Sequence, residues 1–487
     1  MQEHLPENVD FPAPERGIFC NRTLNLRSLP AIGFDMDYTL VHYQVEEWER
    51  RAYEHMRRRL VEQGWPVGHL EFDPDMFALG LILDLELGNV VKANRFGFVK
   101  KAAHGTQMLG YEEQREAYGR VIVDLGEPRW VFMNTLFGLS EGTMFMQAVE
   151  LLDEDKIEDV MGYAELYRTI RASIDETHME GALKSEIISN PERFVVVDEE
   201  LPLALLDLRH AGKKLLLITN SEWSYSRPMM EWAFDRHLPG DMTWRDLFHV
   251  TIVSSGKPGF FNQRRPLFEV INAEGMLRPV RELKEGGVFL GGNAGQVEEF
   301  LGLPGESILY VGDHIFGDVR MSKSVLRWRT ALITRHLEEE LQALEAFKPK
   351  QRALSTKMAE KEVLEHQYSQ LRIRLQRLEK NYGPQPDASA EELQEGVQSL
   401  RAKLLALDAE ISPLAKEASE LSNKRWGLLM RAGNDKSHLA RQMERYADIY
   451  TSRVSNLLTY TPFVYLRSPR GSLPHDSGPA GGFEVAR

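Results

Sequence analysis

Two aspartates one residue apart follow a short apolar run near the start of the chain, in Phe34-Asp35-Met36-Asp37. The run 31–34 is typical of a buried strand, and side chains alternate along a strand, so Asp35 and Asp37 are expected to point the same way. Two carboxylates at that spacing repel each other unless a cation lies nearby. The pattern therefore favours a Mg²⁺ site for phosphoryl chemistry, although an isolated Asp-x-Asp is more often an acidic turn after a strand.

Further apolar runs alternate with helical segments, which predicts a parallel sheet with helices on both faces, a Rossmann-like α/β core. The predicted strands are residues 31–34, 194–197, 214–218, 250–253, 308–311 and 330–333. Ligands of such sheets bind at the carboxyl ends of the strands. Asp35, Thr219, Lys257 and Asp313 all lie at or just past such ends. This placement favours one shared site over four unrelated turn residues.

Composition and periodicity divide the rest of the chain into parts. Alternating short runs between 77 and 99 predict a small β-meander, and residues 130–149 and 157–174 are expected to be mostly helical, so an α+β cap module is inserted after the first strand. Apolar residues spaced by four and three between 364 and 414 predict an antiparallel coiled-coil hairpin for bracing or subunit contact. The expected boundaries are 1–65 for the first part of the core, 66–190 for the cap, 191–336 for the remaining core, 337–425 for the hairpin, 426–475 for a C-terminal helical segment packing on the core and 476–487 for a flexible tail.

Charge and cysteine content restrict the class of protein. The formal net charge of −14 over 487 residues argues against a general nucleic-acid-binding protein, which would carry a basic face. The single cysteine, Cys20, excludes an intrachain disulfide and is typical of a reducing compartment. Residues 1–16 lack the pattern of a signal peptide, and the apolar stretch 454–466 is too short to span a bilayer. We expect a soluble cytoplasmic protein with neither nucleic-acid nor membrane partners.

The residues at the strand ends suit hydrolysis of a phosphate ester through a covalent intermediate. That reaction needs a nucleophile, an acid/base group, charge neutralisation and a metal ion. Asp35 is the candidate nucleophile, and Asp37 would protonate the leaving alkoxide and then deprotonate the attacking water. Thr219 can donate a hydrogen bond to the phosphoryl oxygens, and Lys257 supplies a fixed positive charge.

Mg²⁺ is the expected cofactor. Asp313 would complete its site together with the Asp35 carboxylate and the backbone carbonyl of Asp37. Asp318 would orient metal-bound waters or Lys257 from outside the ligand set. Each residue could also have a purely structural role. Lys257 could be a solvated loop charge, and Asp313 and Asp318 could be helix N-caps. Their order along one α/β chain favours the shared site.

Four motifs lie in order along the chain: Asp35-Met36-Asp37-Tyr38-Thr39, Thr219-Asn220-Ser221, Lys257, and Gly312-Asp313 through Gly317-Asp318. They resemble the four motifs of the haloacid dehalogenase superfamily. This resemblance implies phosphoryl transfer on a Rossmann-like core, with the phosphate held by Thr219, Asn220, Ser221 and Lys257.

Longer stretches at 134–137, 171–184, 312–318 and 442–450 resemble, more narrowly, the cytosolic purine 5′-nucleotidases that prefer IMP and GMP. An acidic side chain suits the N1–H and N2 donors of guanine, and an arginine suits its O6 and N7 acceptors. In this chain Gly138 stands where the family has an asparagine, which leaves the base preference open. The roles that the resemblance implies are stacking on the base for Phe137, reading of the base edge and ribose for Arg171, Asp175 and His178, and binding of the phosphate for Lys184.

The same resemblance implies a second site for an activating purine nucleotide, and assembly into a homo-oligomer, a dimer or a tetramer. The candidate effector residues are Asn134, Gln442, Arg445 and Tyr446. Ser324 stands where the family has a second lysine, and residues 472–487 are not acidic as the tails of animal members are. These departures leave activation open.

Three functions are compatible with the sequence. The leading hypothesis is Mg²⁺-dependent hydrolysis of purine nucleoside 5′-monophosphates, with a nucleoside able to replace water and receive the phosphoryl group. An alternative is a phosphatase for another small phosphometabolite, such as a sugar phosphate, which Gly138 supports. The third is a catalytically silent scaffold that works through its coiled coil. The intact set of candidate catalytic residues argues against the scaffold, because a scaffold needs no nucleophile.

Overall fold

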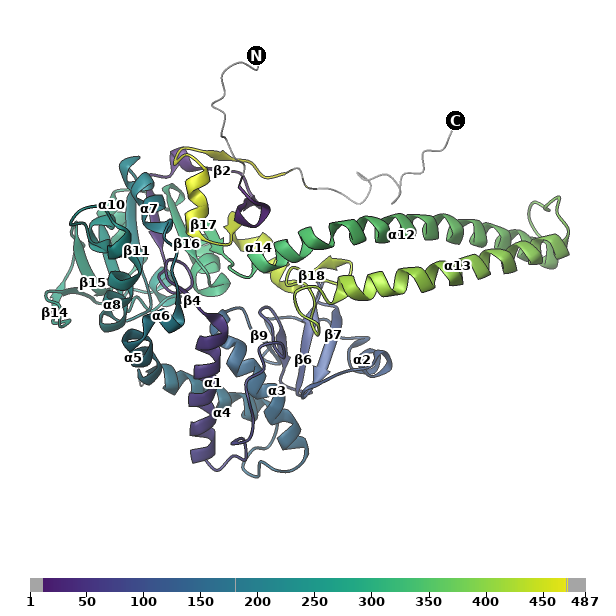
Figure 1. Cartoon of the computed structure of the whole chain (residues 1–487), viewed down its shortest axis with the longest axis horizontal. Coiled ribbons are helices and arrows are strands. Elements are labelled where there is room, and N and C mark those ends of the chain that lie inside the picture. The colour runs from purple at the N-terminus through teal and green to yellow at the C-terminus, as the bar shows by residue number, and fades with distance from the viewer. Residues whose placement is uncertain (1–11, 180, 470, 472–487) are drawn as a thin grey trace, which may run out of the picture. The chain divides into compact units, whose positions relative to one another are not determined.

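The computed structural model describes residues 12–179, 181–469 and 471, without the side chains of 176–179. The chain forms two compact units, of which the larger comprises Met1–Glu339 and Leu429–Pro469. A ten-stranded sheet lies at the centre of the larger unit (Figure 1). In spatial order its strands are β1 (Ile18–Cys20), β20 (Ile449–Thr451), β17 (Arg329–Ile333), β16 (Ile308–Gly312), β3 (Ala31–Phe34), β11 (Lys214–Ile218), β12 (Val250–Val253), β15 (Gly287–Gly291), β13 (Leu267–Val270) and β14 (Leu277–Val280).

The strands from β20 to β15 run parallel, and β1, β13 and β14 are antiparallel additions at the edges. The α/β class expected from the apolar runs is therefore confirmed. One predicted strand was misplaced: residues 194–197 form only β10 (Val195–Val196), which pairs with β4 (His42–Tyr43) outside the main sheet. The sheet instead takes in β15 and β20, which the sequence did not reveal.

Helices cover the sheet as a parallel arrangement requires, and Figure 1 shows α7, α8 and α10 beside strands β11 and β15. The helices of this part of the chain include α7 (Leu201–His210), α8 (Trp223–Phe234), α10 (Ala294–Leu301) and α11 (Met321–Leu326). One buried cluster against the sheet combines aliphatic side chains with five aromatic ones, Phe260, Phe261, Phe289, Tyr310 and Trp328. Burying several such rings stabilises the core and fixes the strand ends from which the polar residues emerge.

The segment inserted between β4 and β10, here called the cap segment (residues 45–194), contains helices and a five-stranded antiparallel sheet of order β8-β7-β6-β5-β9. Helices α3 and α4 pack against α1, and α1 buries its apolar stripe there. The elements are α1 (Val45–Glu62), β5 (Ile82–Asp84), β6 (Asn89–Ala93), β7 (Val99–His104), β8 (Gln107–Met108), α2 (Tyr111–Tyr118), β9 (Trp130–Phe132), α3 (Leu139–Asp153), α4 (Tyr163–Met179), α5 (Ala182–Ser189) and α6 (Pro191–Phe194).

Two parts of the cap segment differ from expectation. Residues 130–149 are mostly helical as expected, through the 3-10 turn Leu136–Gly138 and α3, but Trp130–Phe132 pairs with β5 as a strand. The meander's third strand begins at Val99, because Asn94 binds the backbone N–H groups of Phe96 and Phe98 and closes a turn there. A side chain that bonds its own backbone competes with the strand ladder, which the apolar pattern alone did not show.

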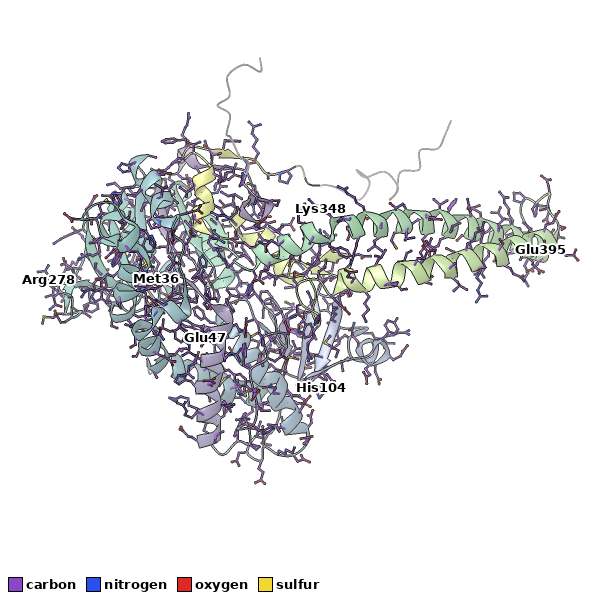
Figure 2. All side chains as sticks on the ribbon, in the orientation of Figure 1. Met36, Glu47, His104, Arg278, Lys348 and Glu395 are labelled. Carbon is purple, nitrogen blue, oxygen red and sulfur yellow. The ribbon has the colours of Figure 1, made fainter. Side chains whose placement is uncertain are left out.

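Among the described residues, the smaller unit comprises Glu340–Leu428 and contains most of α12 (Leu337–Lys380) and all of α13 (Ala390–Ser419). The helices run antiparallel, because ion pairs join residues whose numbers fall in one helix as they rise in the other: Lys350–Glu417, Lys357–Glu410 and Lys361–Asp408. Leu407 and Ile411 are buried between them. Figure 2 marks the pair with Lys348 on α12 and Glu395 on α13.

The C-terminal stretch returns to the larger unit and is not the helical run expected over 426–475. It contains one helix of nine residues, α14 (His438–Tyr446), together with short strands. Its strand β20 joins the main sheet beside β17, where Asp448 accepts from Lys323, Arg329 and the backbone N–H of Thr330. The tail 476–487 lies outside the described residues. Among the described helices, none combines the length and apolar character that a bilayer span requires.

Candidate active site

The polar residues predicted as a site lie at the carboxyl ends of four adjacent strands. β3 lies between β16 and β11, and β12 follows β11. The register pairs Phe34 with both Val311 and Leu217, so the three central strands end level and the residues after them emerge side by side. The strands that follow β3 in the chain lie on both sides of it, with β11 and β12 on one side and β16 on the other. This reversal of strand order marks the position where open α/β sheets bind ligands.

Lys257 joins two of the predicted carboxylates in a buried network. Its Nζ lies 2.8 Å from Asp35 Oδ1 and 2.8 Å from Asp318 Oδ1, and it donates to the Tyr310 hydroxyl at 3.0 Å. The Lys257 side chain is 2% exposed. Burial would lower the pKa of Lys257, but Asp318 and Asp35 outweigh burial and hold it well above its usual value. The lysine is therefore a fixed positive charge at the end of β3.

Two glycines allow this close approach. A Cβ on Gly33 would lie 2.9 Å from the Tyr310 ring, so the small residue on β3 makes room for the tyrosine on β16 whose hydroxyl reaches Lys257. A Cβ on Gly312 would lie 2.6 Å from the Asp318 side chain. Asp318 can therefore fold back over the end of β16, where its Oδ2 accepts from the backbone N–H of His314 at 3.1 Å.

Three carboxylates form an acidic cluster beside Lys257. One oxygen each of Asp35, Asp313 and Asp318 lies within 4.8 Å of the others. Burial raises the pKa of Asp35 to about 6, despite the opposing effect of Lys257, and burial with repulsion from Asp318 and Asp35 raises that of Asp313 well above its usual range. Clustered carboxylate oxygens are the ligands that a hard divalent cation prefers, so the donor set fits Mg²⁺. Asp318, placed outside the ligand set by the sequence, lies inside this cluster.

Asp37 stands apart from the acidic cluster and accepts two side-chain hydrogen bonds. Its Oδ1 accepts from the Tyr43 hydroxyl at 2.5 Å, and its Oδ2 accepts from Ser221 Oγ at 2.6 Å. Burial and the neighbouring Asp35 raise the pKa of Asp37, while both hydrogen bonds oppose the rise. The Asp37 carboxylate is thus fixed in direction, two residues from the candidate nucleophile.

The second motif braces the loop that carries Lys257. Asn220 Oδ1 accepts from the backbone N–H of Lys257 at 2.7 Å, and Asn220 Nδ2 donates to the Lys257 carbonyl at 3.0 Å. Thr219 is fully buried, and its Oγ1 accepts from the backbone N–H of Ser221 at 3.1 Å. The structure therefore gives Asn220 a loop-bracing contact in addition to its place on the pocket wall.

Two adjoining pockets of 270 and 340 Å³ open over these residues. The 270 Å³ pocket is lined by the acidic cluster and Lys257, and the 340 Å³ pocket extends from Asp37 along the cap segment. They share the lining residues Asp37, Thr135, Phe137, Asn220 and His314. The smaller pocket offers charged groups, and the larger one offers aromatic and polar side chains. Together they suit a small molecule that carries a phosphate.

The larger pocket is lined by residues predicted to contact the base and ribose and by Lys184, which was predicted to bind the phosphate. Phe137, Arg171, Asp175 and Lys184 all lie on its wall, and the side chain of His178 lies outside the described residues. Arg171 bonds Asp175 at 3.1 Å and also Glu141, a fully buried acid, at 2.9 Å. Lys184 Nζ lies 2.6 Å from Glu222 Oε2.

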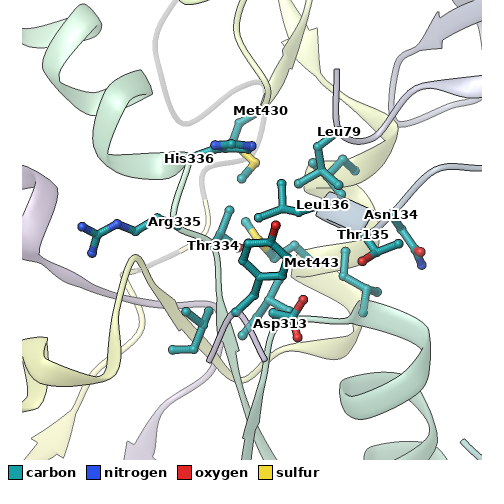
Figure 3. Close-up of a pocket in the computed structure, with 15 residues that line it drawn as sticks. Leu79, Asn134, Thr135, Leu136, Asp313, Thr334, Arg335, His336, Met430 and Met443 are labelled. Carbon is teal, nitrogen blue, oxygen red and sulfur yellow. The ribbon is translucent and has the colours of Figure 1, made fainter. Parts of the chain in front are cut away.

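The candidate effector residues do not line a single pocket among those described. Asn134 lines a separate cavity of 20 Å³ with Leu136, Asp313 and Met443 (Figure 3). That volume holds about one water molecule and is far too small for a nucleotide. On α14, Gln442 bonds His438, and Arg445 lies over the Tyr446 ring. The effector site stays a prediction.

Sequence reasoning did not select several residues that the fold brings to the site: Tyr43, Glu141, Tyr225, Tyr310 and His314. His314 had a signal, since it directly follows Asp313 in the motif. Its Nδ1 accepts from the backbone N–H of Gly317, and burial lowers the pKa of His314 to about 4, so it is neutral at physiological pH. The tyrosines and Glu141 had no local signal, because only the pairing of distant elements brings them together.

The family to which these motifs belong follows from comparison with known proteins. The model of the 5′ nucleotidase family matches residues 18–478 of this chain. The chain belongs to the 5′-nucleotidase family. It is accordingly a phosphoric monoester hydrolase of this type, as the resemblance of its motifs indicated.

Individual relatives are more distant. A 5′-nucleotidase domain-containing protein from Dictyostelium discoideum is 26% identical over 473 residues, covering 94% of this chain and 74% of that protein. A β-phosphoglucomutase from Pyrococcus sp. strain ST 04 matches with 10% identity and a TM-score of 0.30, over 63% of this chain and 86% of its own. A haloacid dehalogenase-like hydrolase from Xanthomonas campestris matches with 13% identity and a TM-score of 0.26, over 63% and 83%. At these scores the structural likenesses carry no weight, and the α/β fold stands on the strand order itself.

Proposed function

We propose that this 5′-nucleotidase hydrolyses purine nucleoside 5′-monophosphates, with IMP and GMP preferred, through an aspartyl-phosphate on Asp35. The observation that carries the proposal is the continuity of the two pockets. One holds Asp35 and Lys257 at the strand ends, and the other holds Phe137 and Arg171 on the cap segment. A nucleotide is a molecule with a phosphate at one end and an aromatic base at the other.

The reaction uses the strand-end residues in sequence. Asp35 attacks phosphorus, and the bond to the 5′ oxygen breaks as Asp37 gives that oxygen a proton. Water then attacks the aspartyl-phosphate while Asp37 takes its proton, which releases phosphate and restores Asp35. Lys257 stays protonated throughout and neutralises charge on the phosphoryl oxygens. A nucleoside in place of water would receive the phosphoryl group, so phosphotransferase activity is a corollary.

The acidic cluster would hold the cation. Asp35, Asp313 and Asp318 supply its carboxylate oxygens, and the backbone carbonyl of Asp37 stays a candidate ligand. When bound, Mg²⁺ supplies positive charge that offsets repulsion between the phosphate and the carboxylates. This role is supported by the raised pKa of Asp35 and Asp313, which is caused first by burial and then by repulsion from the neighbouring carboxylates.

Base selection would fall to the cap segment. The half-buried ring of Phe137 suits an aromatic base, because it lines the pocket while packing edge-to-face with Tyr38 and Trp48. Arg171 offers donors for O6 and N7 of a 6-oxopurine, and Asp175 offers an acceptor for N1–H. The two are already paired with each other, so they present a donor and an acceptor side by side.

A panel of phosphorylated metabolites tests the substrate class. We expect kcat/KM for IMP and GMP to exceed that for AMP, CMP and sugar phosphates by at least about tenfold, the discrimination expected of one or two base contacts. The assays include Mg²⁺, and parallel reactions contain ATP to test activation by a nucleotide. Phosphate release without preference for purine monophosphates would favour the second candidate, a phosphatase for another small phosphometabolite.

Two observations keep that second candidate in view. Gly138 removes an amide that the related enzymes place next to the stacking ring. Arg171 is also engaged by the buried Glu141, which competes with a base for its donors. The cytoplasmic location and the homo-oligomeric state stay predictions, and the oligomeric state is measured by light scattering of the purified protein.

A further inference from the structure

Two tyrosine hydroxyls bonded in series reach Asp37. The Tyr225 hydroxyl donates to the Tyr43 hydroxyl at 3.0 Å, and Tyr43 donates to Asp37 Oδ1 at 2.5 Å. Ser221 Oγ donates to the other oxygen, Oδ2, at 2.6 Å. Both carboxylate oxygens of Asp37 therefore have a defined partner.

Counting hydrogens gives the direction of this series. A hydroxyl carries one hydrogen, and that of Tyr43 is used at Asp37, so Tyr43 can only accept from Tyr225. The Tyr225 hydroxyl occupies a lone pair of the Tyr43 oxygen, and this leaves the Tyr43 hydrogen directed to Oδ1 of Asp37. A carboxylate held on one oxygen by such a pair cannot rotate freely about its Cβ–Cγ bond.

The two tyrosines are rigidly placed by separate elements. Tyr43 lies on β4, where it pairs with Val195, and its ring packs on those of Tyr38 and Trp48 at centroid distances of 5.2 and 4.5 Å. Tyr225 lies in the first turn of α8. The exposed fractions are 3% for Tyr43 and 2% for Tyr225. Buried side chains that are locked by packing lose little further entropy when they orient a reacting group.

The two oxygens of Asp37 face different surroundings. Tyr43 does not line either of the two active-site pockets, whereas Ser221 and Asp37 both line the larger one, and Tyr225 contributes to its wall. Oδ2 is thus the oxygen whose partner, Ser221, itself lines the larger pocket, whereas the partner of Oδ1, Tyr43, lines neither pocket. A serine hydroxyl can turn from Oδ2 to a phosphoryl oxygen, while Tyr43 keeps its bond to Oδ1.

We propose that Tyr43 and Tyr225 are positioning residues for the acid/base step, which fix Oδ1 of Asp37 so that Oδ2 faces first the leaving oxygen and then the attacking water. The proposal rests on the proposed function, because it assumes reaction through Asp35. The proton moves from Oδ2 to the leaving 5′ oxygen as the P–O bond breaks, and returns to Oδ2 from water as the bond between Asp35 and phosphorus breaks. The Tyr43 hydrogen stays on Tyr43 in both steps.

The test compares leaving groups in Tyr43→Phe and Tyr225→Phe. A nucleoside monophosphate leaves as an alkoxide and needs a proton, whereas 4-nitrophenyl phosphate leaves as a stable phenolate and does not. For Tyr43→Phe we expect kcat on the nucleotide to fall by about 10² with KM within about twofold, the range of general acid–base catalysis. With 4-nitrophenyl phosphate, formation of the aspartyl-phosphate stays fast, so rapid mixing gives a burst of one 4-nitrophenolate per active site. The later turnovers are slow, because hydrolysis of the aspartyl-phosphate lacks an oriented base for the attacking water.

Two other variants provide a weaker test of the same contact and a control. Tyr225→Phe keeps the ring on the pocket wall and removes the hydroxyl that bonds Tyr43, so its losses are smaller and in the same direction. Tyr53→Phe removes a buried hydroxyl that bonds Gln147 in the cap segment, and it leaves both substrates unchanged. Near-UV circular dichroism and Tm are recorded for every variant, so a folding defect is recognised.

The outcomes separate this proposal from the proposed function. Equal losses on both substrates without a burst would mean a purely structural role and would overturn the positioning proposal. If Tyr43→Phe does not fold, Tyr225→Phe decides alone, and a profile identical to the unmodified protein rejects the proposal. If the unmodified protein releases phosphate from no monoester, the proposed function itself is rejected.

Discussion

At the scale of single residues, the acidic cluster of the site combines three aspartates with one lysine. Asp35 and Asp318 share Lys257 at equal distances of 2.8 Å, and Asp313 brings a third carboxylate into the same cluster. Removing Lys257 would leave two buried acids without their cation, whereas removing one acid leaves the lysine still paired. Single acid-to-amide changes are therefore the cleaner probes of chemistry.

The first prediction concerns Asp35. Asp35→Asn keeps the shape of the side chain but removes the nucleophile, and Lys257 keeps its partner Asp318. We expect phosphate release to fall by about 10³-fold or more, with an unchanged far-UV circular dichroism spectrum. Asp241→Asn, at an exposed position, is the matched control and should retain full activity. Activity close to that of the control would refute Asp35 as the nucleophile.

At the scale of elements, helices α1 and α3 of the cap segment meet over a buried acid. Glu49 on α1 is fully buried, and its Oε2 accepts from the backbone N–H of Ser140 at the start of α3 at 2.7 Å. Burial is the main cause that raises the pKa of Glu49 from 4.5 to about 8. The folded protein therefore keeps a proton on Glu49 over a range of pH in which the unfolded chain has lost it.

The second prediction follows from the sign of that difference. Neutral Glu49 contributes fully to stability below pH 4.5, and the contribution is lost as pH rises to about 8. The free energy of unfolding should fall by up to about 1.4 kcal/mol per pH unit in this window relative to Glu49→Gln, which cannot ionise. Thermal unfolding of both proteins from pH 5 to 8.5 measures the effect. Parallel Tm curves would contradict it.

Elements also show what the sequence could and could not predict. Strands β11 and β12 were placed correctly because each is an unbroken apolar run followed by a polar turn. β20 has only three residues, and its surroundings carry enough Arg and Tyr to imitate a helical pattern, so its place in the sheet was missed. Asp35 and Asp37 were found because they are neighbours in sequence, whereas Tyr43 and Tyr225 are 182 residues apart and meet only in the fold.

At the scale of the whole molecule, stability is coupled to the acidic cluster. A ligand that binds only the folded state stabilises it by RT ln(1 + [L]/Kd), about 2.7 kcal/mol at a hundredfold excess over Kd. Burial is the main cause that raises the pKa of Asp35 and Asp313, so their charged forms are costly in the folded protein even beside Lys257, and a divalent cation bound there would offset that cost.

The third prediction is that saturating Mg²⁺ raises Tm of the unmodified protein by several degrees and that Asp313→Asn loses most of this shift. Asp241→Asn, which changes a surface carboxylate, should keep the full shift. Differential scanning fluorimetry after treatment with EDTA, with and without added Mg²⁺, provides the measurement. An equal shift in Asp313→Asn would place the cation elsewhere.

The position of β20 has a consequence for how the chain is made. The strand β17 has β16 on one side and β20 on the other, yet β20 is synthesised more than a hundred residues later. A nascent chain emerging from the ribosome at about 5–20 residues per second therefore carries a sheet without β20, with an open β17 edge, for several seconds. An exposed strand edge invites pairing with other chains. Translation rate and chaperone availability should thus matter most while residues 334–448 are being added.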